Sequence, residues 1–137
     1  MHIGDRSDIF YASWHQYPFY PRSGAATQTN RHQTIVNCPL HIGACETELL
    51  ASWQTRVRPA LEEFEPQLIL ISAGFDADTR DPLASLQVTT NGFRELSQQI
   101  VEWSDRHCGG RLVSVLEGGY HLDALAEDVA AHVATLL

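Results

Sequence analysis

The sequence is poor in cysteine, and its three cysteines, Cys38, Cys45 and Cys108, have no C-x-x-C spacing. A disulfide framework needs an even set of cysteines, and a zinc knuckle needs closely spaced cysteine pairs. Both are therefore excluded. We predict that the three thiols are reduced, small and partly buried.

Basic residues are also few, with nine Lys and Arg against 17 Asp and Glu and a net charge of -8. Nucleic-acid binding needs a basic patch, so this charge argues against it. No apolar run approaches the roughly 20 residues of a membrane span. The first five residues have neither the basic start nor the apolar core of a signal peptide. We therefore expect a cytoplasmic protein without nucleic-acid or membrane partners.

Residues 68–73 contain a continuous apolar run, L-I-L-I, followed by S-A-G and then Asp76. Such a run without alternation is typical of a strand buried on both faces of a parallel sheet. Ligands of open parallel sheets bind outside the carboxyl ends of the strands, so Asp76 is a candidate metal ligand or catalytic group. By this stretch alone, an aspartate that only caps its own turn is the simpler interpretation.

Two further stretches have a similar build. Residues 112–116 (L-V-S-V-L) form a second apolar run, and E-G-G follows it and leads to Tyr120. Residues 8–14 (D-I-F-Y-A-S-W) form a third candidate strand, followed by His15, Gln16 and the aromatic stretch Y-P-F-Y-P that ends at Pro21. The three strand ends together offer an acid, a phenol and a histidine with an aromatic wall, which indicates a small-molecule site.

The remaining pattern is α/β. Apolar residues at helical spacing predict helices over residues 44–64, 90–107 and 122–137. Pro59 should kink or divide the first, and Gly109-Gly110 should end the second. Residues 34–37 are predicted as a short edge strand that Pro39 closes. A chain of 137 residues with 44% hydrophobic residues suits a single domain, residues 1–137, with a parallel sheet of about three main strands flanked by helices.

Three motifs occur in order: H-Q-Y-P-F-Y-P, I-S-A-G-F-D-A-D-T-R-D-P-L and L-E-G-G-Y-H-L-D-A-L. From about residue 8 to its end the chain resembles the C-terminal part of the histone deacetylase superfamily, in particular its class II-like and acetylpolyamine amidohydrolase branch. The resemblance implies a truncated domain with part of the three-layer arginase/deacetylase-like fold. It also implies that the strand at residues 68–73 lies between the other two main strands.

The resemblance assigns roles to single residues. Asp76 matches an aspartate that ligates the catalytic zinc in the family. Tyr120 matches the tyrosine that donates a hydrogen bond to the developing oxyanion. Further matches lie in the channel for the acyl-lysine and at a monovalent-cation site: Tyr20 (or else Phe19) and Leu83 in the channel, and Ser13 with the carbonyl of Trp14 at the cation site.

The resembled family holds its zinc with two aspartates and one histidine and uses a histidine pair as general acid and base. A catalytic zinc keeps about three protein ligands and an open position. These 137 residues contain no D-x-H-H-G motif and no adjacent histidines. Although zinc is the cofactor of the family, we expect none in the isolated chain, and no deacetylase activity from it.

Three functions remain open. In the first, the chain is a structural relative of the deacetylases that is inactive by itself. In the second, it is one half of a zinc-dependent amidohydrolase that another chain completes. In the third, it is a binding module for an acyl-lysine or a polyamine.

The partners follow from the strand at residues 112–116. In the resembled fold it pairs on its free side with a strand that this sequence lacks. An exposed edge and apolar flank invite association. We therefore expect either a homodimer that buries residues 112–116 and the third helix, or a complementary N-terminal half.

Overall fold

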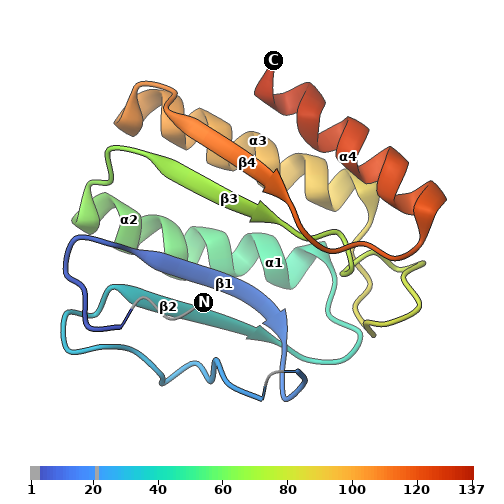
Figure 1. Ribbon diagram of the computed structural model, residues 1–137, viewed down its shortest axis with the longest axis horizontal. Helices are drawn as coiled ribbons and strands as arrows, with labels where there is room; N and C mark the ends of the chain where they lie inside the picture. Colours follow the sequence, from blue (N-terminus) through green and yellow to red (C-terminus); the bar gives the residue numbers. More distant parts are fainter. Residues whose placement is uncertain (1–3, 21) are drawn as a thin grey trace.

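The computed structural model describes residues 4–20 and 22–137. Its four strands are β1 (Tyr11–Gln16), β2 (Ile35–Leu40), β3 (Ile69–Ala73) and β4 (Leu112–Leu116). Hydrogen bonds pair β1 with β2 and β3 with β4, and both pairs are parallel. In Figure 1 all four strands point the same way, and β3 lies between β1 and β4. The α/β class with parallel strands flanked by helices is confirmed, although in the described residues no ladder joins β1 to β3.

The first two strands extend further along the chain than predicted. The strand predicted over residues 8–14 is β1, which begins at Tyr11 and includes His15 and Gln16. Parallel pairing with β2 explains the shift, since the register continues as far as Gln16 opposite Leu40. β2 likewise passes through Pro39 instead of ending there. Proline is tolerated in an edge strand because its missing N–H faces no partner.

The first predicted helix is divided, as the proline in it suggested. It consists of α1 (Glu46–Ser52), a π-helical turn η1 (Trp53–Val57) and α2 (Arg58–Phe64). Pro59 lies in the first turn of α2, where its missing N–H costs little. The backbone N–H of Arg58 donates to the carbonyl of Trp53, five residues earlier. The wider turn gives the proline ring room, so the division of the helix has a defined cause.

The other two helices agree with the prediction to within one residue at each end. They are α3 (Thr90–Cys108) and α4 (Leu122–Leu136). Gly109 takes the left-handed conformation after α3, with φ at 61°. The N–H of Gly110 donates to the carbonyl of Ser104 at 3.1 Å, which completes the helix end. No helix in the described part of the chain is long and apolar enough to cross a membrane.

The predicted burial of both faces of β3 and β4 is wrong for this structure. Ile69 and Ile71 face inward toward the helices, whereas Leu70 is exposed. Val113 and Val115 of β4 are exposed as well, and Val113 is the register partner of Leu70. Figure 1 shows the reason, because α1, α2 and α3 lie behind the strands and leave the opposite face without a helix from the described residues. We call this exposed face the outer face of β3–β4.

Candidate functional site

The candidate site lies where β3 and β4 end. Because the two strands are parallel, the loops that follow them meet at one edge of the pair, as Figure 1 shows. Asp76 lies in the first loop and Tyr120 in the second. Two backbone hydrogen bonds of 2.9 Å join the loops, from the N–H of Glu117 to the carbonyl of Ala73 and from the N–H of Phe75 to the carbonyl of Gly118. The structure therefore brings the predicted acid and the predicted phenol to the same rim.

Two glycines make room for the Asp76 carboxylate. A methyl group added at Gly118 would lie 2.9 Å from Oδ1 of Asp76, and one added at Gly74 would lie 3.1 Å from the same oxygen. Both separations are too short for ordinary contacts. The sequence suggested only that these glycines allow the backbone to turn. The structure shows that glycine is needed at both positions because the Asp76 carboxylate occupies the space where a side chain would lie.

The surroundings of Asp76 disfavour its negative charge. Burial raises the pKa of this carboxyl and outweighs the lowering effect of a hydrogen bond from the backbone N–H of Asp76, and the nearby charge of Asp81 adds a smaller raising effect. A bound cation would reverse this penalty, so Asp76 fits the part of one oxygen ligand of a zinc ion. The described residues contain no group of three His, Cys, Asp or Glu placed to hold a metal. The role of Asp76 as a zinc ligand therefore stays a prediction.

The phenol of Tyr120 is presented to solvent, whereas its backbone is fixed. The side chain is more than half exposed. The backbone N–H of Tyr120 donates to Oδ2 of Asp81 at 2.7 Å. Directly after Tyr120, the imidazole of His121 caps α4 by accepting from the N–H of Ala124 at 3.3 Å. The tyrosine is therefore held between a hydrogen bond to the neighbouring loop and the start of a helix.

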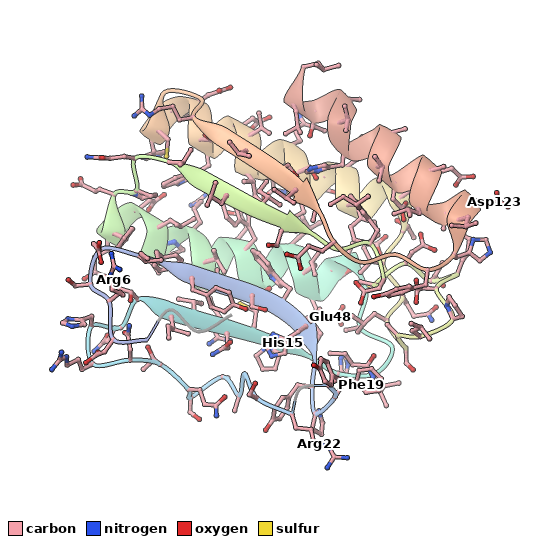
Figure 2. The ribbon with its side chains drawn as sticks, viewed as in Figure 1. Arg6, His15, Phe19, Arg22, Glu48 and Asp123 are labelled. Atoms are coloured by element: carbon pink, nitrogen blue, oxygen red, sulfur yellow. The ribbon has the colours of Figure 1, made fainter. Side chains whose placement is uncertain are left out.

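The aromatic segment lies beyond the carboxyl end of β1. Figure 2 labels Phe19 and Arg22 there. Both line an open cavity of about 380 Å³ together with Pro18 and Tyr20. The last member of the predicted aromatic wall, Pro21, lies outside the described residues.

The carboxyl end of β1, directly before the aromatic segment, is tied to the loop that follows β3. The backbone N–H of Ser85 donates to Oε1 of Gln16 at 2.8 Å. Leu83, the other predicted channel residue, is exposed in that loop. The carboxyl ends of β1, β3 and β4 thus lie along one edge.

His15 and Ser13 interact with each other. Ser13 Oγ lies 3.0 Å from Nδ1 of His15, and Nε2 of His15 lies 2.9 Å from the carbonyl of Gly24. Figure 2 shows His15 along β1. His15 therefore holds the loop after β1 against the strand and does not lie past the strand end, where the sequence had suggested it. Ser13 as part of a cation site stays a prediction.

Sequence reasoning missed a charged cluster behind the loop. The guanidinium of Arg80 donates to the carboxylates of Asp78, at 2.9 and 3.1 Å, and of Glu127, at 2.7 Å. Thr90 donates to the fully buried Asp128 beside them. Burial acts to raise the pKa of both aspartates. Arg80 outweighs it at Asp78, whose pKa is lowered, whereas the pKa of Asp128 is raised. This cluster fastens the loop of Asp76 to α3 and α4.

Comparisons with known proteins agree with this arrangement. The model of the histone deacetylase domain matches residues 2–136. "Histone deacetylase 10, chloroplastic" of Oryza sativa subsp. japonica is 42% identical over 126 residues, which are 90% of this chain and 28% of that protein. "Polyamine deacetylase HDAC10" of Mus musculus is 38% identical over 144 residues, covering 98% of this chain and 21% of that protein.

A solved structure shows the same fold. The crystal structure of the HDA15 HD domain superposes with a TM-score of 0.87 at 32% identity, covering 96% of this chain and 38% of that one. The chain therefore belongs to the histone deacetylase domain family. It spans less than a third of the two curated relatives.

Proposed function

We propose that these 137 residues are the part of a zinc-dependent amidohydrolase that supplies one metal ligand, Asp76, and the oxyanion donor, Tyr120. The observation that carries this proposal is the Asp76 carboxylate, held in a glycine cradle on the same rim as Tyr120. Its raised pKa suits a group whose charge is to be matched by a cation. The substrate class is an acylated amine, of the acetyl-lysine or acetylpolyamine kind.

The division of labour follows from the chemistry of amide hydrolysis. Zinc, when bound, would polarise the amide carbonyl and lower the pKa of a water molecule. The hydroxyl of Tyr120 would donate a hydrogen bond to the oxygen on which negative charge develops. Phe19, Tyr20 and Leu83 would line the approach of the acyl chain. The remaining ligands and the general base would come from a segment with the D-x-H-H-G motif, which the 137 residues do not contain.

The free edge of β4, together with the adjoining outer face of β3–β4, is the proposed docking surface for that segment. Its exposed apolar side chains include Leu70, Val113 and Val115. Contiguous apolar side chains of this kind mark interaction sites. A homodimer that covers the same face is the alternative.

A cytoplasmic location is also part of the proposal. The name of the rice relative gives that protein a plastid location. Cell fractionation would distinguish the two locations for this protein.

The first experiment titrates zinc into the 137-residue chain at neutral pH and assays an acetyl-lysine substrate. We expect neither stoichiometric binding nor turnover from the chain alone. Both should appear when the chain is mixed with the portion of the rice relative outside the matched region.

Two variants separate the roles in that mixture. Asp76→Ala should remove tight zinc binding and turnover together. Tyr120→Phe should retain zinc and lose turnover by about 100-fold or more, as for other oxyanion donors. If the isolated chain turned over substrate and Asp76→Ala abolished that turnover, the claim that the 137 residues lack a complete catalytic site would be overturned. Full turnover by Tyr120→Phe would overturn the role of the phenol.

A binding module is the second candidate, favoured by the cavity lined by Pro18, Phe19, Tyr20 and Arg22. The positive charge of Arg22 disfavours a cationic polyamine and favours a neutral acyl group there. An acetyl-lysine peptide should then raise the melting temperature of the isolated chain. Arg22→Ala should keep this shift, whereas Phe19→Ala should reduce it.

A further inference from the structure

Another aspartate of the loop after β3, Asp81, contacts both halves of the rim. Its side chain is buried, with 8% of the residue exposed. Oδ2 accepts the N–H of Tyr120 at 2.7 Å. Oδ1 accepts the N–H groups of Leu83 at 2.9 Å and of Ala84 at 3.4 Å. Hydrogen bonds from backbone N–H groups to a carboxylate are shorter and stronger than neutral ones, so this one side chain links the two loops firmly.

The backbone before Tyr120 needs such an anchor. Two glycines precede the tyrosine, and Gly119 has φ at +132°, a conformation that side chains rarely adopt. Glycine leaves the chain many conformations, so Gly118 and Gly119 by themselves do not fix where the phenol points. The carbonyl of Gly118 is held by the N–H of Phe75, and the hydrogen bond from the N–H of Tyr120 to Asp81 fixes the backbone on the other side of Gly119.

We propose that Asp81 is a positioning residue, which sets the place of the Tyr120 phenol relative to Asp76. Its catalytic consequence rests on the function proposed above for those two residues. An oxyanion donor acts only within a narrow range of distances, so a loop held loosely at Tyr120 would lose the effect without losing the phenol.

The first test needs neither zinc nor substrate. Amide hydrogen exchange is followed by NMR on the chain with ¹⁵N-labelled tyrosine, which gives four resonances, and on a uniformly labelled sample for the strand amides. The amide of Tyr120 should be protected in the wild type. Asp81→Ala should accelerate its exchange by about tenfold or more relative to the amides of β3 and β4. Asp81→Asn keeps an oxygen acceptor and should restore part of the protection.

Asp123→Asn is the matched control. Asp123 is an exposed acid three residues from Tyr120, in the first turn of α4, and Figure 2 shows it at the end of that helix away from the strands. Its substitution should leave the exchange of the Tyr120 amide unchanged relative to the strand amides. An unprotected Tyr120 amide in the wild type would overturn the inference, and so would an Asp81→Ala variant that loses protection equally at Tyr120 and in the strands.

The second test uses the zinc-loaded mixture described above. There, Asp81→Ala should lower kcat by about tenfold or more with KM little changed, because the phenol acts in the transition state. Lost protection at Tyr120 together with an unchanged kcat would overturn the positioning role and leave the proposed function intact. A mixture without any turnover would instead count against the proposed function, and the exchange result would stand by itself.

Discussion

Asp76 has an electrostatic cost that its own backbone N–H offsets only in part, because its carboxylate is partly buried beside Asp81. Asp76→Asn removes the charge and keeps the shape. We expect this variant to raise the free energy of unfolding of the 137-residue chain by about 1 kcal/mol at pH 7. Urea unfolding measures the difference, and Glu63→Gln, at an exposed acid of α2, is the control that should change nothing.

The pH dependence of this difference has a defined sign. The folded chain binds a proton at Asp76 at higher pH than the unfolded chain does, because its folded pKa is raised. As the pH falls through the folded pKa, the wild type should gain stability relative to Asp76→Asn, until the unfolded chain is protonated near pH 3.9 as well. A constant difference between the two proteins from pH 7 to pH 4 would contradict this explanation.

The glycine cradle gives a second prediction at this scale. Gly118→Ala places a methyl group 2.9 Å from Oδ1 and 3.1 Å from Cγ of Asp76. We expect a loss of about 1–3 kcal/mol in the free energy of unfolding, as in other overpacked sites. In the double variant with Asp76→Ala most of that loss should disappear, since the clashing atoms are gone. Thermal or urea unfolding of all four proteins completes the cycle, and additive losses would show that the clash is elsewhere.

At the residue scale the sequence was informative where the signal is local. Asp76 and Tyr120 could be placed on one rim because each follows an apolar run and a small-residue turn. The contact of Asp81 with the backbone of Tyr120 could not be predicted. The two residues are 39 positions apart in the sequence, and their contact depends on how two loops meet. The ion pair of Arg80 with Glu127 joins residues 47 apart and depends on where α4 packs.

Among the elements, α4 and β4 are connected through a buried histidine. Nδ1 of His132 lies 2.7 Å from Oγ of Ser97 on α3, and Nε2 lies 2.8 Å from Oγ of Ser114 on β4. Burial lowers the pKa of His132. An imidazole between two hydroxyls therefore holds a strand and two helices together in its neutral form.

This histidine predicts a loss of stability in acid. The unfolded chain takes up a proton at His132 near pH 6.5, and the folded chain takes it up only at lower pH. The free energy of unfolding should therefore fall as the pH drops below about 6.5, until the folded pKa is reached. His132→Gln should be less stable at pH 7 but should lose less on acidification. His41→Gln, at an exposed histidine, is the control, and an identical acid loss in His132→Gln would refute the assignment.

The elements also show how far periodicity can be used. Pro59 predicted a break in the first helix correctly, because proline has a fixed local effect. The L-I-L-I run predicted burial on both faces of β3, but Leu68 and Leu70 are exposed. Apolar composition reports which surfaces a strand can bury. It does not report whether the described chain supplies the layer that covers them.

At the scale of the whole molecule, one apolar face of the sheet is therefore left uncovered by the described residues. Leu70 is 70% exposed on the outer face of β3–β4, and in the described residues β4 pairs only with β3. We expect the isolated chain to self-associate at micromolar concentration, most simply as a dimer. Leu70→Glu should shift the equilibrium toward the monomer, because the dimer interface would bury an unpaired carboxylate. Light scattering measures the mass.

Ile42→Glu is the matched control for the association. Ile42 is 73% exposed, about as much as Leu70, but it lies in the loop between β2 and α1 and belongs to neither β3 nor β4. This variant should associate like the wild type. A wild-type chain that remains monomeric, or equal effects of the two substitutions, would remove the outer face as the interface.

The charged cluster behind the rim has a consequence for how the protein is made. The loop of Asp76 is fastened through Arg80 to Glu127 on α4, and α4 is the last of these elements to be synthesised. During translation the strands and α3 leave the ribosome before the helix that anchors the loop. The rim therefore takes its final shape only after α4 has emerged, so a nascent chain whose emerged part ends between residues 116 and 122 would display a paired β3–β4 with a loose Asp76 loop.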